Sequence, residues 1–145
     1  MSEYNSTQAP KWFVTVGIVA LVWNLLGVAA YVMQVSMSPE TLAALPEAER
    51  ALYETTPAWA TAAFALAVNV GALGCLLLVL KKSWAFPLLV LSLVSVLVQM
   101  FHAFFISNSF EVFGPGGTIM PLLVVIVAVY LVLLAKSAKA KGWLS

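Results

Sequence analysis

The sequence predicts an all-α, polytopic membrane protein: a four-transmembrane-helix bundle with a short helical external loop, forming one membrane domain over residues 1–145. Of the 145 residues, 63% are hydrophobic and only 9% are charged, whereas about a quarter of the residues of a soluble domain are charged. The mean hydropathy is +1.02, and the apolar residues fall into long runs. A formal net charge of +1 also excludes a nucleic-acid-binding chain.

Four apolar runs are long enough to cross a membrane. A helix needs about 20 residues to cross roughly 30 Å of hydrocarbon at about 1.5 Å per residue. The runs cover residues 12–35, 58–80, 84–106 and 118–135. They are continuous rather than alternating, which indicates helices and not the strands of a membrane barrel.

The charges of the connecting segments predict the orientation. All six lysines fall on one side of the predicted bundle and five of the six glutamates on the other, with Arg50 as the exception among the cations. The lysines are Lys11, Lys81, Lys82, Lys136, Lys139 and Lys141, and the glutamates are Glu40, Glu47, Glu49, Glu54 and Glu111. The positive-inside rule then places both termini in the cytoplasm. Tryptophans near the span ends fit the headgroup level: Trp12, Trp59, Trp84 and Trp143.

Two external loops join the spans. In the first, residues 36–57, Ser38-Pro39-Glu40 is a helix-start signal and Pro46 can open a second short helix. We favour an acidic, solvated cap, and a lid over an outward-facing cavity is the alternative. The second loop, residues 107–117, ends in a run of glycine and proline that predicts a turn. It lacks the residues of a phosphate-binding loop, so we exclude nucleotide binding.

Polar side chains inside the spans form the candidate site, because such groups are costly at membrane depth and usually face protein or water. Residues 92, 95, 99 and 102 fall within about 80° of one helical face, and residues 24, 27, 31 and 34 repeat that spacing. One more amide lies near the middle of the second span, flanked on its face by Ala62, Ala65 and Ala72. We call the candidate ligand-binding residues the polar seam: Asn24, Tyr31, Gln34, Asn69, Ser92, Ser95, Gln99 and His102.

Two interpretations of the polar seam stay open. Its amides and hydroxyls can form hydrogen bonds between helices, which average about 0.6 kcal/mol each in membranes, and this interpretation is favoured. Alternatively, the seam lines a cavity open to the outside, because Gln34, Gln99 and His102 lie in the outer halves of their spans. A cofactor site is the least favoured interpretation.

His102 is the one side chain that invites a chemical role. It could move protons or bind a metal or haem, but the chain has no second histidine, and a hydrogen bond to Gln99, Tyr31 or a serine is the simpler role. We therefore predict no metal, no cofactor and no catalytic residue, and do not expect an enzyme. No span carries Asp or Glu, which excludes coupling through a membrane carboxylate, and the lone Cys75 excludes an intramolecular disulfide.

The second span also carries a row of small residues, Ala63, Ala67, Gly71 and Cys75, spaced four apart. Small residues at that spacing let helix backbones approach closely. The row can pack inside one chain, or Ala63, Ala67 and Gly71 can form the contact of a homo-oligomer. The fourth span has no strongly polar residue except Tyr130, so we expect it to be the most lipid-exposed.

Four stretches together resemble a set of small bacterial four-span membrane proteins that are often labelled "sugar transporter". They are Trp23-Asn24-Leu25-Leu26-Gly27-Val28-Ala29-Ala30-Tyr31, Met37-Ser38-Pro39-Glu40, Pro46-Glu47-Ala48-Glu49-Arg50 and Pro57-Ala58-Trp59. The resemblance covers most of the chain and implies a multi-pass protein of the bacterial inner (cell) membrane. It brings no catalytic or binding residues with it.

These observations leave three functional hypotheses. The first is an oligomeric transporter, embedded in the lipid bilayer, that carries a small polar, sugar-like solute. The alternative is a non-catalytic membrane subunit or scaffold of a larger complex. The third is an integral membrane enzyme or redox-site protein centred on His102.

Overall fold

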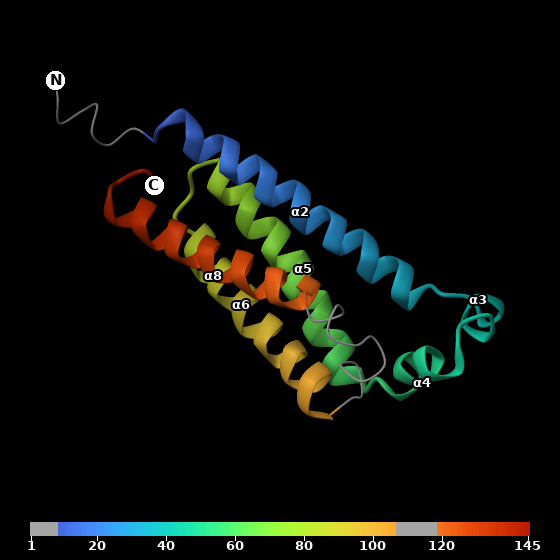
Figure 1. Ribbon diagram of the computed structural model, residues 1–145. Coiled ribbons are helices and arrows are strands. Elements are labelled where there is room, and N and C mark those ends of the chain that lie inside the picture. Colours follow the sequence, from blue (N-terminus) through green and yellow to red (C-terminus); the bar gives the residue numbers. More distant parts are fainter. Residues whose placement is uncertain (1–8, 107–118) are drawn as a thin grey trace, which may run out of the picture.

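The computed structural model describes residues 9–106 and 119–145, and within them the all-α, four-span prediction is confirmed (Figure 1). Four helical segments are long and apolar enough to cross a membrane. They are α2 (Lys11–Val35), α5 (Ala58–Val79), α6 (Ala85–Phe101) with its continuation η1 (His102–Ile106), and α8 (Ile119–Ala140). The short helices α3 (Pro39–Ala43) and α4 (Glu47–Thr55) join α2 to α5.

The predicted bounds of the first three spans agree with the structure to within one residue, but α8 continues past the predicted end at residue 135 to Ala140. The prediction stopped at Lys136 because a charge ends an apolar run. Lysine and alanine are good helix formers, however, and a lysine stem can lie along apolar surface while its ammonium reaches water. Gly142, two residues beyond the last helical residue, has φ 79°, and Trp143 N–H donates to the Ala138 carbonyl over 2.9 Å, which terminates the helix.

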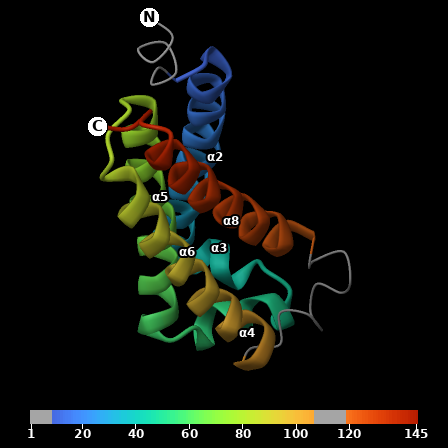
Figure 2. The same ribbon diagram turned by 90° about the vertical axis from the view of Figure 1, so that its left-hand side faces the viewer.

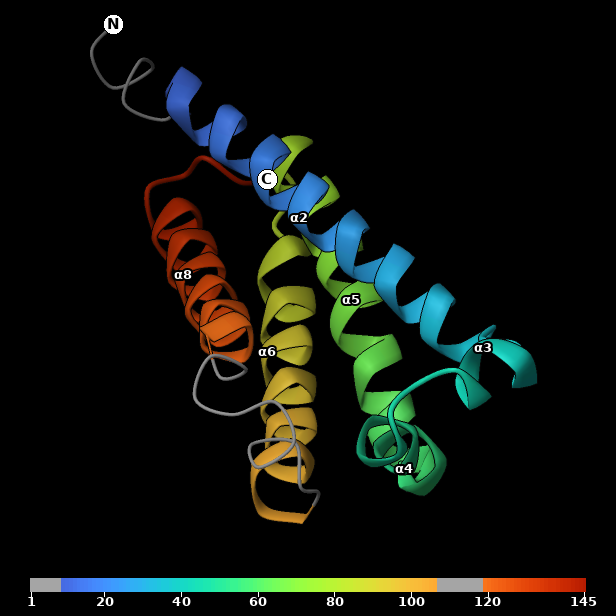
Figure 3. The same ribbon diagram turned by 45° about the vertical axis from the view of Figure 1, so that its right-hand side comes forward.

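The spanning helices form an open arc in the order α2, α5, α6, α8 (Figure 3). α5 packs against both α2 and α6, and α6 packs against α8. Among the described helices, α2 and α8 make no extensive contact with each other. These two outer helices therefore bury the smallest share of their residues, so α8 shares the greatest exposure with α2 rather than having it alone.

One end of the bundle, here called the lysine end, carries Lys11, Lys81, Lys82, Lys136, Lys139 and Lys141. The C-terminal residues close it. Trp143 packs edge-on against Phe13 of α2 with ring centroids 5.3 Å apart. Ser83 N–H donates to the Ser145 carbonyl over 3.0 Å, and Ser145 N–H donates to the Lys81 carbonyl over 2.9 Å. The C-terminus thus ties α8 to α2 and to the turn between α5 and α6.

The opposite end, here called the loop end, carries α3 and α4 (Figures 1 and 2). Ser38 Oγ accepts from Thr41 N–H over 3.1 Å and Pro39 follows it at the helix start, so both short helices begin at the predicted signals. Neither helix has a buried residue, which fits a surface cap better than a lid packed over the bundle. Glu111 and the second external loop lie outside the described residues.

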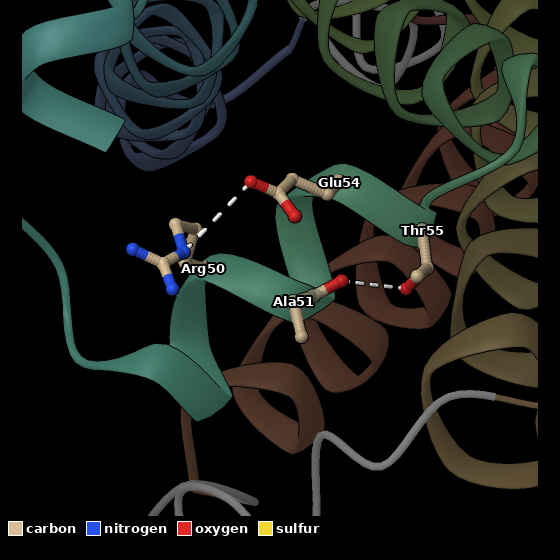
Figure 4. A network of polar contacts seen from close by, with 4 residues as sticks. All are labelled: Arg50, Ala51, Glu54 and Thr55. Atoms are coloured by element: carbon tan, nitrogen blue, oxygen red, sulfur yellow. Dashed lines mark hydrogen bonds and ion pairs between the residues drawn. The ribbon is translucent and has the colours of Figure 1, made fainter. Parts of the chain in front are cut away.

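Arg50, the cation on the acidic side, is paired within α4. Its Nε lies 3.8 Å from Glu54 Oε1, one helical turn away (Figure 4). Thr55 Oγ1 donates to the Ala51 carbonyl over 2.7 Å in the same view. An exposed pair at this spacing contributes only about 0.3–0.5 kcal/mol to stability, but Glu54 offsets the positive charge of Arg50. Within the described residues, the lysines and the acidic residues therefore remain segregated at opposite ends of the bundle.

Candidate binding cavity

A cavity of about 430 Å³ lies between all four spanning helices. α2 lines it with residues between 23 and 30, α5 with residues between 64 and 71, α6 with residues between 89 and 100, and α8 with residues between 120 and 131. In α2, α5 and α8 these positions lie in the middle or toward the loop end, and on α6 they extend from Leu89, near the lysine end, to Met100. Most of the cavity therefore lies away from the lysine end.

The packing of α2 and α8 explains this position. The buried residues of α2 are Phe13, Gly17 and Ala20, all in its first half. The buried residues of α8 lie in its second half, from Leu131 onward. Both sets are near the lysine end, where they join one hydrophobic core. Toward the loop end α2 and α8 diverge (Figure 3), and residues of both helices in this region line the cavity.

Asn24 and Ser92 form the polar floor of the cavity and also join helices. Asn24 Nδ2 donates to the Ala20 carbonyl over 2.9 Å and to Cys75 Sγ of α5 over 3.4 Å. Ser92 Oγ of α6 donates to the Ala67 carbonyl of α5 over 2.6 Å. At this level the polar seam both packs the helices and lines a cavity.

Gly71 makes this three-helix junction possible. A Cβ at this position would overlap Asn24 Oδ1 and lie 2.9 Å from Ser92 Oγ. The missing side chain thus lets polar atoms from α2 and α6 meet over α5. Ala63, Ala67 and Cys75 are buried with Gly71, so this row of small residues packs inside one chain. Association between copies through the row stays a prediction.

Gln99 is the third polar side chain of the cavity. It is half-buried, lies two turns beyond Ser92 on α6, and lines the cavity. Its amide makes no hydrogen bond to any residue that the structure describes, so both its donor and its acceptor can serve a bound molecule. Asn24 Oδ1 likewise accepts no hydrogen bond from any described residue, because both side-chain bonds of Asn24 in these ranges are donated by Nδ2.

The other residues of the polar seam do not line the cavity. Tyr31 packs edge-on against Phe64, with ring centroids 5.5 Å apart. Ser95 Oγ donates to the Leu91 carbonyl of its own helix over 2.9 Å. Gln34 is half-buried on α2. The face that sequence periodicity makes continuous is therefore divided between the cavity and ordinary packing.

His102 and Asn69 have different surroundings from those expected. His102 is buried and packs edge-on against Trp59, with ring centroids 5.4 Å apart. Its backbone N–H donates to the Gln99 carbonyl within the helix, but within the described ranges its imidazole makes no hydrogen bond to the side chain of Gln99, Tyr31 or a serine. No group of three metal-ligating side chains occurs in those ranges either. Asn69 lies on the exposed face of α5, where Nδ2 donates to the Ala65 carbonyl over 2.8 Å.

Sequence reasoning missed the apolar walls of the cavity. Trp23, Met100, Met120, Pro121 and Val124 line it, yet an apolar side chain in a membrane span carries no mark that separates a cavity wall from a lipid contact. The contribution of α8 was missed altogether, since that helix has no strongly polar residue facing the bundle. Gly71 is the sequence feature that could have located the polar floor of the cavity.

No protein-family model, curated protein or solved structure matches this chain. The functional assignment therefore depends on the cavity, its lining and its position in the bundle. The protein that contains this cavity is a multi-pass membrane protein, with four apolar helices in its described residues.

Proposed function

We propose that this protein is a small-solute carrier of the bacterial inner membrane and that the cavity between α2, α5, α6 and α8 is its solute site. The observation that carries the proposal is the convergence of Asn24, Ser92 and Gln99 on one cavity lined by all four spans. Its volume of about 430 Å³ lies within the range of about 300–1,000 Å³ typical of small-molecule sites.

The lining favours a neutral, mostly apolar solute with one hydrogen-bonding group. Apart from Asn24, Ser92, Gln99 and the indole of Trp23, the lining residues are apolar. The proton of Ser92 and the amide nitrogen of Asn24 are already engaged. A sugar would bury several hydroxyls for which the site has no partner, at about 1–3 kcal/mol each. An amphiphile with a single hydroxyl or carbonyl satisfies the site better than the sugar-like solute that the resemblance suggests.

The two ends of the bundle would have different roles in such a carrier. The solute enters where α2 and α8 diverge, toward the loop end. The packed core around Phe13, Leu78 and Trp143 closes the path toward the lysine end. Release on that side then requires α2 to separate from the C-terminal residues, as one part of a carrier rocks against another.

Binding by three ring compounds of similar size tests the solute site. Menthol carries one hydroxyl, menthane carries none and glucose carries several. We expect saturable binding of radiolabelled menthol to the protein in nanodiscs, with much weaker binding of menthane and glucose. Gln99→Leu should weaken menthol binding about tenfold or more, because a hydrogen-bonding group in a dry site then loses its partner. Gln34→Leu, the same change on an amide outside the cavity, should leave it unchanged.

Two tryptophan variants of α8 give a second control. Ala128→Trp fills the cavity and should abolish menthol binding, whereas Val129→Trp adds the same side chain at an exposed neighbour and should not. Binding of glucose in preference to menthol would restore the sugar-like assignment. Binding of none of the three compounds would contradict the carrier proposal and favour the non-catalytic membrane subunit.

The proposed orientation places the lysine end, and with it both termini, in the cytoplasm. Cysteine labelling tests it, because Cys75 is fully buried and provides a silent background. A membrane-impermeant maleimide added to spheroplasts should label Glu47→Cys in α4 directly. It should label Lys82→Cys, in the turn between α5 and α6, only after the membrane is opened. Labelling of both positions from the same side would refute the orientation.

A further inference from the structure

The outward side of α5 carries a regular face of small residues with one amide at its centre. The face consists of Ala58, Ala62, Ala65, Asn69, Ala72 and Leu76. These residues are alternately four and three apart and fall within about 80° of one another around the helix. Such a seven-residue repeat is the pattern by which two helices pack side by side with a left-handed crossing. We call it the alanine face.

Nothing in residues 9–106 and 119–145 covers the alanine face. Ala58, Ala62, Asn69 and Leu76 are exposed, and the other two members are half-buried. The neighbours of α5 in the described structure, α2 and α6, pack on its opposite side. There the row from Ala63 to Cys75 is buried.

Exposure of the alanine face to lipid is unfavourable because the face contains the polar side chain of Asn69. Asn69 lies at the middle of a 22-residue helix and hence near the centre of the bilayer. One amide proton is satisfied by the Ala65 carbonyl over 2.8 Å. The other proton and Oδ1 have no partner in the part of the chain that the structure describes. Lipid tails offer no hydrogen bond, so polar groups at this depth are normally covered by protein.

We propose that the alanine face pairs with the same face of a second copy of this chain. Two copies inserted in the same orientation present α5 helices that run parallel, so a two-fold axis along the membrane normal brings each residue of the face opposite its counterpart. Asn69 then meets Asn69, and a carboxamide, being both donor and acceptor, hydrogen-bonds with its own kind.

The rest of the face fits this occupant. Four alanines allow the two backbones to approach closely, which strengthens packing where lipid provides no hydrophobic drive. One polar residue in an otherwise apolar repeat also selects a single register. A different protein would need a hydrogen-bonding side chain at the matching depth, whereas a second copy provides one by symmetry. The pairing does not depend on the solute site.

Disulfide crosslinking in native membranes tests the pairing and leaves Asn69 intact. Ala62→Cys lies on the alanine face, and Leu133→Cys lies on the exposed side of α8. With copper phenanthroline as oxidant, Ala62→Cys should form a covalent dimer with twice the mass of the chain. Leu133→Cys and the wild type, whose Cys75 is buried, should not. Equal crosslinking of the two variants, or a product of another mass, would overturn the proposal.

The amide is tested by a second change in the Ala62→Cys background. Asn69→Leu should weaken self-association about threefold to tenfold, the range expected of an interhelical amide hydrogen bond in membranes. Asn69→Gln should retain most of it. Because both Leu and Gln are good helix formers, a folded monomer is expected in each case. An Asn69→Leu variant that crosslinks as well as its parent would show that the amide does not hold the two copies together.

Discussion

Replacing Phe13 by alanine is expected to lower the free energy of unfolding by about 3 kcal/mol, as truncation of a buried phenylalanine typically does. Phe13 is 1% exposed, and its ring centroid lies 5.3 Å from that of Trp143. Lipid tails are as apolar as the core, so the loss comes from dispersion contacts and from the cavity left behind rather than from transfer out of water. Unfolding by SDS titration in mixed micelles measures it.

Phe105→Ala is the matched control for this change. Phe105 is 78% exposed, so its removal should change the free energy of unfolding by about 0.5 kcal/mol or less. The Phe13 variant should also free the C-terminal residues, which a fluorophore attached at Ser145→Cys would report as faster local motion. Equal losses for the two alanine variants would contradict the packed core that we place at the lysine end.

Gly71→Ala is expected to destabilise the bundle by about 2 kcal/mol, as overpacking of a core typically does. The added Cβ overlaps Asn24 Oδ1 and lies 2.9 Å from Ser92 Oγ. Both polar groups are held by hydrogen bonds to α5, so neither can turn away without breaking one. The same SDS titration measures the change. Binding of menthol should fall with it, because the floor of the cavity is displaced.

A double variant separates this mechanism from a general effect of the substitution. Asn24→Ala removes the group that the new Cβ meets, so Gly71→Ala should cost less in that background, with a coupling of about 1 kcal/mol or more. Gly27→Ala is a milder case, because its Cβ would meet only the apolar side chain of Val68, with Cγ1 at 2.8 Å and Cβ at 3.4 Å, and no hydrogen bond has to break when that side chain shifts. Strict additivity of Gly71→Ala and Asn24→Ala would refute the three-helix junction.

The amino-acid sequence was sufficient to predict the spans, the short helices of the first external loop and the segregation of the lysines. The physical reason is that each of these features is local. Hydrocarbon thickness sets the length of a span, Ser38 and Pro39 begin a helix through their own backbone geometry, and a lysine such as Lys82 marks the end of an apolar run wherever the helix later packs.

The candidate site could be predicted only in part. Helical periodicity correctly placed Asn24, Ser92 and Gln99 on inward faces, but it placed Tyr31, Ser95 and His102 on the same faces without showing that they pack against other partners. It also gave no sign that Asn69 would lie on the exposed side of α5. A helical period groups residues on one helix, and it does not say which neighbour, if any, that face meets.

Where the bundle is packed and where it is open depends on how the helices pack against one another, which the sequence does not reveal. In water, burial follows hydrophobicity, but in a bilayer lipid and protein interior are equally apolar, so Val124 on a cavity wall and Val129 on the lipid side look alike in sequence. Which of the two valines faces the cavity depends on how α2 and α8 diverge from a shared core at the lysine end. That divergence is set by side chains far apart in sequence, Phe13 and Trp143 among them.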